Sequence, residues 1–424
     1  MAGEERLREV SEIVMGQSPP GETYNERGDG LPFFQGVADF NYRHPTPRVF
    51  CSAPSRIAEP GDILLSVRAP IGRVNVADRK CAIGRGLSII RAKRPDDSRY
   101  LEFALRGLER TWEAIEGSGS VFGNATRRDL EELRLPWPER ASDRKAIAHI
   151  LGTLDDKIEL NRRMSETLEA MARALFKWWF VDFEPVRAKL EGRWKCGQSL
   201  PGLPAHLYDL FPDRLVDSEL GEIPEGWEVG RLGDVAEHPR RGLKPVDIEP
   251  STPYIALEHM PRRSIALSEW GTGDGLGSSK FRFKKGEILF GKLRPYFHKV
   301  GVAPVDGVCS TDIVVVTPKR PNWFGFVLGQ VSSVEFVEYT DAGSTGTKMP
   351  RTSWADMARY QVVLPLEPVA EAFAGLVRPA IDRIIAGILE SRTLAALRDA
   401  LLPKLISGEL RVKDAERFLE ERGL

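Results

Sequence analysis

Two long stretches of the chain repeat apolar residues every three or four positions, which is the spacing of a helix with one buried face. The first spans residues 147–178 and the second residues 374–405. A heptad spacing places most of their apolar residues on one seam, and two such seams are buried economically when the helices pair as an antiparallel coiled coil. We predict partner-helix packing for Ile150, Leu154, Asn161, Leu168, Leu175, Ile381, Ile384 and Ile388.

The predicted seam of the first helix continues through Met164 and Met171 to Trp178. Asn161 is a polar residue on this seam. A single buried polar side chain at such a position restricts how two helices can slide past each other, at some cost in stability. We therefore expect Asn161 to help fix the register of the helix pair.

Short runs of Ile, Val and Leu, cut by Gly and Pro, precede each helix, which is typical of twisted sheets with large connecting loops. These runs recur in the same order. Residues 61–65 (Gly-Asp-Ile-Leu-Leu) return as residues 286–290 (Gly-Glu-Ile-Leu-Phe), and the helical segments match from Thr167 and Thr393 onwards. The matches keep an offset of about 225 residues, so we predict a tandem duplication.

The predicted fold class is α+β, with two mixed α/β domains joined by two long helices that form an antiparallel coiled coil. The segment between the two copies is rich in Pro, Gly and Trp without periodicity, so it is either an ordered, irregular connector or a flexible linker. The predicted boundaries are 1–140 (first domain), 141–182 (first helix), 183–226 (connector), 227–366 (second domain) and 367–424 (second helix and C-terminal tail).

The composition excludes some classes of protein but does not identify the function. The 424 residues include 60 Lys and Arg against 61 Asp and Glu, a formal charge of −1, which excludes a uniformly basic nucleic-acid-binding surface. The chain has no run of about 18–20 apolar residues and begins with a charged segment, so we expect a cytoplasmic protein without a membrane partner.

The sequence contains no constellation of catalytic residues. Residues 343–348 (Gly-Ser-Thr-Gly-Thr-Lys) have the wrong spacing for a phosphate-binding loop, and no methyltransferase or dinucleotide-binding motif is present. The six histidines and four cysteines are dispersed without metal-ligand spacing. We therefore predict no catalytic residue, no metal site and no cofactor in this chain.

Positive charge nevertheless collects in one part of each copy. Residues 43–94 hold eleven basic and three acidic side chains, and residues 262–299 hold nine and three. Phosphate binding needs such clusters, and base reading needs Arg, Lys, Asn or Gln on loops that fit a groove. Each segment is either part of a DNA-binding surface or a solvated face balanced by acidic residues elsewhere in the fold.

Two recurrent loops within or after these segments suit DNA contact. One follows directly on a buried strand, whose rigid end aims a long cationic side chain, and the other is rich in Gly, Ser and Thr, whose backbone N–H groups approach a phosphate closely. Ordinary turn chemistry is the alternative for the second loop. The predicted DNA-binding residues are Arg68, Arg73, Arg85, Asn124, Arg127, Lys292, Arg294, Tyr296, Lys348 and Arg351.

Four segments together resemble the DNA-sequence-specificity subunit of type I restriction-modification systems, and the resemblance covers almost the whole chain. They are residues 61–72 (Gly-Asp-Ile-Leu-Leu-Ser-Val-Arg-Ala-Pro-Ile-Gly), the helix over 143–177, residues 179–189 (Trp-Phe-Val-Asp-Phe-Glu-Pro-Val-Arg-Ala-Lys) and residues 221–229 (Gly-Glu-Ile-Pro-Glu-Gly-Trp-Glu-Val).

The resemblance implies that 1–140 and 227–366 are target recognition domains, each reading one half of a split target in double-stranded DNA. It also implies that the helices set the spacing and that two methyltransferase subunits and restriction/translocase subunits dock on the chain. S-adenosylmethionine, ATP and Mg are then expected in those partner subunits, and the chain itself is non-catalytic. The family has no motif that fixes single base contacts, so the predicted DNA-binding residues rest on physical argument.

Helix length is consistent with this role. About 34 residues at 1.5 Å each give a helix of about 50 Å, longer than the roughly 34–36 Å between half-sites one helical turn apart, so inserting whole heptads into both helices should lengthen the unread spacer. Two alternatives remain at this stage: a coiled-coil assembly or adaptor protein without nucleic-acid binding, and a complete nuclease-methyltransferase.

Overall fold

The computed structural model describes residues 3–118, 124–344, 346 and 349–421, which fold into two compact units. Unit 1 combines residues 1–159 with 393–424, and unit 2 comprises residues 160–392. Each unit contains its own sheets and its own segment of the two long helices.

A four-stranded antiparallel sheet forms the centre of unit 1, in the order β2-β10-β7-β8. Alternate residues of β7 face two different cores. Ile63 and Leu65 pack with the helices, whereas Leu64 packs with Phe34 and Ile83 of a second sheet. Burial on both faces explains the continuous apolar run in the sequence. The strands are β2 (Ser11–Met15), β7 (Ile63–Ser66), β8 (Val74–Val76) and β10 (Leu87–Ala92).

The second sheet of unit 1 has the order β3-β5-β4-β9-β6, in which β4 and β9 run parallel. Its strands are β3 (Tyr24–Asn25), β4 (Leu31–Phe34), β5 (Phe50–Cys51), β6 (Ile57–Ala58) and β9 (Cys81–Ile83). A separate pair joins β1 (Gly3–Arg6) to β11 (Arg134–Trp137). The helices particular to this unit are α1 (Leu7–Val10), α2 (Ser98–Arg106), α3 (Glu109–Ser118), α4 (Arg127–Glu132) and α12 (Val412–Glu420).

Unit 2 repeats the first sheet strand for strand and four strands of the second, whose fifth strand lies on the other edge. One sheet has the order β15-β23-β20-β21 and the other β16-β19-β22-β17-β18, again with one parallel pair, β17 and β22. The first sheet comprises β15 (Ala236–Glu237), β20 (Ile288–Gly291), β21 (Val300–Val302) and β23 (Ile313–Pro318). The second comprises β16 (Gly242–Leu243), β17 (Pro253–Ile255), β18 (Gly271–Thr272), β19 (Lys280–Phe283) and β22 (Gly307–Cys309).

The strand pair β14 (Glu228–Arg231) and β24 (Gln361–Leu364) corresponds to β1 and β11. The short helices of unit 2 are α7 (Leu232–Val235), α8 (Phe324–Val331), α9 (Val334–Ala342) and α10 (Trp354–Met357). The predicted tandem duplication is therefore confirmed, because the order and direction of pairing in the main sheets recur in both copies.

Residues between the copies add a small aromatic layer to unit 2. The segment contains α6 (Glu184–Leu190), a 3-10 helix over Ala205–Leu210 and the hairpin β12 (Leu215–Ser218) with β13 (Gly221–Pro224). Trp194 and Phe211 from this segment are buried, and Phe211 packs edge-on to Trp179 with 5.0 Å between ring centroids.

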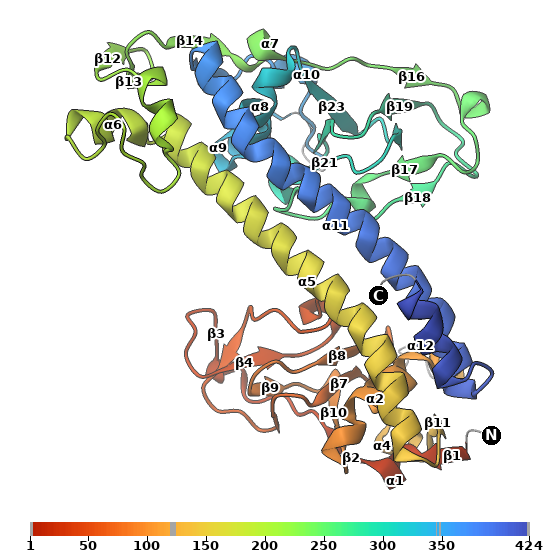
Figure 1. Cartoon of the computed structure of the whole chain (residues 1–424). Helices are drawn as coiled ribbons and strands as arrows, with labels where there is room; N and C mark the ends of the chain where they lie inside the picture. The colour runs from red at the N-terminus through yellow and green to blue at the C-terminus, as the bar shows by residue number, and fades with distance from the viewer. Residues whose placement is uncertain (1–2, 119–123, 345, 347–348, 422–424) are drawn as a thin grey trace. The chain divides into compact units, whose positions relative to one another are not determined.

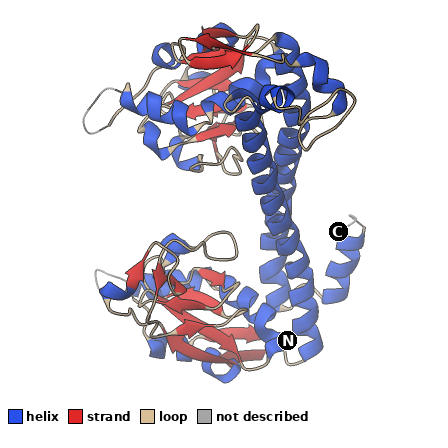
Figure 2. Ribbon diagram, turned by 90° about the vertical axis from the view of Figure 1, so that its left-hand side faces the viewer, coloured by secondary structure: helices blue, strands red, loops and turns tan. Residues whose placement is uncertain are grey.

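The two long helices, α5 (Ala141–Phe180) and α11 (Glu367–Ser407), pack antiparallel (Figure 1). In unit 2, Asn161 of α5 donates a hydrogen bond of 2.8 Å to Glu390 of α11, whereas Phe176, further along α5, lies beside Phe373, earlier in α11. In each unit the strands lie beside that unit's segment of the helix pair (Figure 2). The predicted fold class is confirmed.

The predicted heptad seam is wrong in the second half of α5. Met171 is 55% exposed, and Ser165, Phe176 and Trp179 are buried instead. From Ile147 onwards the buried positions follow the 3.6-residue turn of a straight helix, which drifts by about 20° per heptad from a 3.5-residue repeat.

The other predicted packing residues differ in their burial. Ile150, Leu154, Asn161, Ile381, Ile384 and Ile388 are buried, and Leu168 and Leu175 are half-buried. Within the described ranges, none of the helices combines the length and apolar character needed to cross a bilayer.

Candidate nucleic-acid interface

The two recurrent loops of unit 1 lie side by side at the end of β7. The backbone N–H of Ala125 donates to the carbonyl of Val67 (2.8 Å), and Arg68 faces Asn124 in an isolated antiparallel bridge. Arg68 and Asn124 are both exposed. The fold thus presents together two predicted DNA-binding side chains that are far apart in the sequence.

Unit 2 builds the same junction at the end of β20. The N–H of Thr352 donates to the carbonyl of Lys292 (3.0 Å), and Leu293 faces Arg351 in an antiparallel bridge. The N–H of Arg294 also donates to the carbonyl of Pro350 (2.8 Å). The backbone framework of the two candidate reading surfaces is therefore the same in both copies.

The side chains on this framework are not equivalent. By their hydrogen bonds, Lys292 corresponds to the buried Val67, and Leu293 rather than Arg294 corresponds to Arg68. Arg294 has φ +51° and is half-buried, with its guanidinium carbon 6.0 Å from the ring centroid of Phe297. The two units therefore offer cations at different points of the same loop.

Arg68 and Arg85 line one hollow of about 280 Å³, together with Gln35 and Gly36. Nε of Arg85 donates to Oγ of Ser18 (3.1 Å). Arg68 makes no ion pair with any residue that the structure describes. An exposed guanidinium beside a polar hollow suits contact with a phosphate or with the acceptor edge of guanine.

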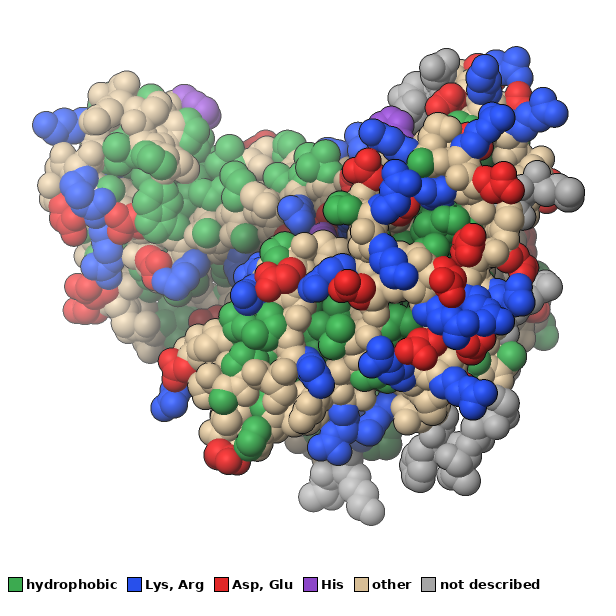
Figure 3. Space-filling view, turned by 90° about the horizontal axis from the view of Figure 1, so that it is seen from below, with side chains coloured by type: hydrophobic (Ala, Val, Ile, Leu, Met, Phe, Trp, Pro, Cys, Tyr) green, Lys and Arg blue, Asp and Glu red, His purple; other side chains and the backbone are tan. Residues whose placement is uncertain are grey.

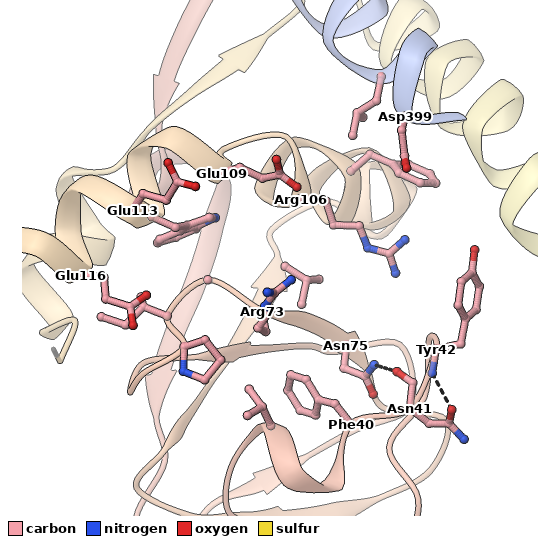
Figure 4. A pocket seen from close by; sticks show the side chains of 18 of the residues that line it. Phe40, Asn41, Tyr42, Arg73, Asn75, Arg106, Glu109, Glu113, Glu116 and Asp399 are labelled. Atoms are coloured by element: carbon pink, nitrogen blue, oxygen red, sulfur yellow. Dashed lines mark hydrogen bonds between the residues drawn. The ribbon is translucent and has the colours of Figure 1, made fainter. Parts of the chain in front are cut away.

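Arg73 and Arg127 lie among carboxylates. Nε of Arg127 donates to Glu131 (2.7 Å). Arg73 lines a larger cleft of about 800 Å³, to whose lining α3 contributes Glu109 and Glu113 (Figure 4). Nearby negative charge opposes phosphate binding at both positions, so these two candidates are weaker than Arg68.

The candidates of unit 2 have mixed surroundings. Lys292 is half-buried, and Arg351 pairs with Asp312 (3.4 Å). Tyr296 is 49% exposed, and its ring stands edge-on to Phe297 with centroids 4.7 Å apart. Lys348 lies outside the described residues.

Comparison with known proteins identifies a family. The family model for the type I restriction modification DNA specificity domain matches residues 3–170. The MjaIX specificity subunit of a type I restriction enzyme from Methanocaldococcus jannaschii is 27% identical over 96% of this chain and 93% of its own length. The EcoDI specificity subunit from Escherichia coli is 25% identical over 73% of this chain and 70% of its own.

Residues 3–170 thus match a specificity-domain model, and almost the whole chain is similar to a type I restriction enzyme specificity subunit. The fold of the chain is also that of the S subunit of a type I restriction-modification system from M. genitalium, which is 15% identical, covers 95% of both chains and superposes with a TM-score of 0.55.

The basic segments are less available for DNA contact than their composition suggests. More than half of the cations in residues 43–94 pair with carboxylates, and carboxylates lie among the Lys and Arg side chains on the face shown in Figure 3. The paired residues are Arg43, Arg48, Arg79, Lys80, Arg91 and Arg94. A large part of residues 43–94 is therefore a solvated face whose positive charges are balanced by carboxylates, which was the second interpretation of the basic segments.

Sequence reasoning missed a cluster of buried charges in unit 1. Tyr42, Asp155 and Arg398 meet in unit 1, and Asp155 is fully buried. The available signal was Arg398, a charged residue on the apolar seam of the second long helix. No group of three or more His, Cys, Asp or Glu side chains in the described part of the chain is placed to hold a metal ion.

Proposed function

We propose that this chain is a specificity subunit that reads a split target in double-stranded DNA, one half with each unit. The observation that carries the proposal is the repeated loop junction, in which one backbone framework holds different side chains in the two copies. A fixed framework positions the protein on DNA, and the variable side chains read base edges in the major groove. Unequal side chains in the two units predict two unequal half-sites.

In unit 1, Arg68 and Asn124 are suited to read bases. A guanidinium binds O6 and N7 of guanine, and a carboxamide binds N6 and N7 of adenine. In unit 2, Lys292, Arg294 and Tyr296 lie at the corresponding strand end, beside Arg351. Arg85 supplies a second cation at the hollow beside Arg68, which suits a backbone phosphate.

The chain acts, in this proposal, as the non-catalytic subunit that directs two methyltransferase subunits and the restriction/translocase subunits to the target. An apolar surface on α5 in unit 2 supports protein docking. Leu160 is 53% exposed, Met171 is 55% exposed, and Met164 between them is half-buried. Exposed large apolar side chains in a row are typical of a surface that a partner covers.

The partner subunits bring S-adenosylmethionine, ATP and Mg, and the whole complex works in the cytoplasm, where its DNA lies. The helix pair sets the unread spacer between the half-sites. α5 and α11 have 40 and 41 residues and are each continuous, so at 1.5 Å per residue each is about 60 Å long.

The test uses the subunit co-expressed with the methyltransferase subunits of its host. Methylated positions are mapped across the genome, and binding to a duplex that carries the mapped site is measured at several salt concentrations. We expect one bipartite methylated sequence and an affinity that falls steeply with salt, because each neutralised phosphate releases counterions. Methylation without sequence preference, or binding that does not respond to salt, would favour an adaptor built around a coiled coil without DNA binding.

A further inference from the structure

A network of buried charges joins four segments of unit 1. The carboxylate of Asp155 on α5 is fully buried and accepts hydrogen bonds from Tyr42 (3.0 Å), Arg106 of α2 (2.6 Å) and Arg398 of α11 (2.5 Å). Nη1 of Arg398 also donates to the hydroxyl of Tyr42 (2.7 Å). Three donors from three segments thus converge on one carboxylate.

A second layer surrounds this centre. Glu102 of α2 is 2% exposed and pairs with Arg106 (2.7 Å) and Arg43 (3.5 Å). Asp156 of α5 receives hydrogen bonds from Arg43 (3.2 Å) and from Arg99 of α2 (2.9 Å). The first recognition domain therefore contacts its helix segments through directional, charge-assisted bonds in addition to apolar packing.

The electrostatics of the network depend on all its members. Burial alone would raise the pKa of the Asp155 carboxyl, but the guanidinium groups of Arg106 and Arg398 outweigh burial and hold that pKa below its ordinary value. Burial raises the pKa of Glu102, and Arg106 and Arg43 oppose this rise without cancelling it. Removing one cation would leave a buried negative charge short of partners.

At the positions that correspond to this network, unit 2 carries apolar residues, although Glu169 of α5 accepts a hydrogen bond from Ser264 (2.9 Å) elsewhere in its junction. α8 takes the place of α2, so Leu328 stands where Glu102 is in unit 1, and Gly329 follows it. A Cβ on Gly329 would lie 2.1 Å from the ring of Phe176 of α5, which shows how closely this helix approaches. In the repeat alignment of the long helices, Ile381 replaces Asp155 and Ala172 replaces Arg398.

The contrast between the units has a physical meaning. Apolar contacts are non-directional and accept small slides and rotations of one element on another. A buried charge network tolerates only the geometry in which every donor and acceptor is satisfied, and in some proteins such groups are retained for specificity rather than stability. At these corresponding positions, unit 1 has the restrictive kind of contact and unit 2 has the permissive kind.

The network also connects to the candidate reading loop of unit 1. Tyr42 follows Asn41, whose carbonyl accepts a hydrogen bond from Nδ2 of the buried Asn75 on β8 (2.9 Å). β8 pairs with β7, whose end leads directly to Arg68. A shift of the network would thus reach the loop through two short, ordered steps.

We propose that the charge network centred on Asp155 and Arg398 is a positioning device that holds the first recognition domain at one angle on the helix pair. This inference rests on the proposed function. In this proposal, unit 1 determines which spacer lengths the protein accepts. While the network is intact, the first half-site is read only at one distance from the second. The residues position the reading loop and do not themselves touch DNA.

The test compares variants in the co-expressed methyltransferase complex. The double variant Asp155→Ile with Arg398→Ala copies the unit 2 residues and leaves no isolated charge at these two positions. The milder Tyr42→Phe removes one hydrogen-bonding hydroxyl and preserves the fold. The control Leu130→Ala makes a cavity in the apolar core of unit 1 and removes none of the hydrogen bonds of the network. Each complex is scored by its melting temperature and by genome-wide mapping of methylated sites.

We expect the wild-type complex and the Leu130→Ala control to methylate sites of one spacer length, although the control melts at a lower temperature. The double variant should methylate sites whose spacer is one base pair longer or shorter about tenfold more often than wild type, with Tyr42→Phe between the two. The base preference of both half-sites should stay unchanged.

Two results would overturn the inference. A folded double variant that keeps the single spacer length shows that the network does not position the domain. An equal spread of spacer lengths in Leu130→Ala shows that loss of stability alone is responsible. If the wild-type complex methylates no specific sequence, the proposed function itself fails, and this outcome is distinct from the other two.

Discussion

Arg68 and Arg294 belong to the same repeated motif, yet their side chains lie in different surroundings. Arg68 is exposed at a polar hollow, whereas Arg294 is half-buried against Phe297. The difference arises because Arg294 occupies the position of Ala69 rather than that of Arg68 in the paired loops. At this scale, a shared motif predicts a shared backbone but not a shared side-chain role.

Substitution of one cation should affect one half-site. Arg68→Ala should weaken binding to duplexes with an intact first half-site by about 1–3 kcal/mol, the range for a lost bidentate base contact. Lys292→Ala should do the same for the second half-site. Competition binding with duplexes altered in one half at a time measures both effects.

Arg127→Ala is the matched control, because Arg127 already pairs with Glu131. It should change affinity by less than about 0.5 kcal/mol. Loss of both half-sites from a single substitution would contradict reading by two separate units.

The buried carboxylate of Asp155 should make the stability of unit 1 depend on pH. Its folded pKa is below the ordinary value of about 3.9, so its contribution is fully present above that pH and is lost as the pH falls through the folded pKa. Asp155→Asn should cost about 3–5 kcal/mol at neutral pH, as expected for a broken buried ion pair.

Urea unfolding of wild type and Asp155→Asn at several pH values tests this. The difference in free energy of unfolding should shrink below about pH 4, where the wild-type carboxylate also becomes protonated. A difference that stays constant from neutral to acidic pH would show that Asp155 contributes by packing and not by its charge.

Helices α2 and α8 show how one element is adapted to two junctions. α2 carries Arg99, Glu102 and Arg106 toward the helix pair, whereas α8 carries Gly325 and Gly329. Small residues let α8 approach the aromatic rings of α5 and α11, and charged residues let α2 bond to them. Both solutions fill the space between a recognition domain and its helix segment.

The close approach of α8 predicts a large effect from one methyl group. Gly329→Ala should destabilise unit 2 by about 1–3 kcal/mol, because its Cβ would overlap the ring of Phe176. Gly375→Ala on α11 is the control, since a Cβ there meets no atom within 4 Å. It should stabilise by about 0.5–1 kcal/mol through better helix propensity.

Thermal unfolding of the two variants checks this prediction. Equal melting temperatures for Gly329→Ala and Gly375→Ala would show that the ring of Phe176 moves aside freely. The junction of unit 2 would then be looser than its packing indicates.

At the scale of the whole molecule, α5 and α11 are each continuous and contribute a segment to both units. Their buried positions follow the turn of a straight helix, so the insertion that best preserves the seam is not a heptad. About eighteen residues make five full turns of 3.6 residues, whereas seven residues leave the seam rotated by about 20°.

Inserting about eighteen residues into both helices, after Glu159 in α5 and before Thr393 in α11, should lengthen the spacer by about eight base pairs, because about 27 Å of helix corresponds to that length of duplex. Both half-sites should remain as in wild type, and methylation mapping reports both. A seven-residue insertion should give a less active complex, because the apolar seams of the two helices are then rotated and no longer face each other. Altered half-site sequences in the eighteen-residue variant would refute the role of the helices as a spacer.

The sequence by itself determined the duplication, the two long helices and the absence of a recognisable catalytic motif, because hydrophobic periodicity and repeated strand motifs are local signals. It also pointed to Arg68 at a strand end. Only the tertiary structure decided that residues 124–125 pair with the strand end, since this contact joins distant segments. Tertiary packing likewise brought Tyr42, Asp155 and Arg398 together and neutralised much of the first basic segment, because burial and ion pairing depend on neighbours that no local pattern specifies.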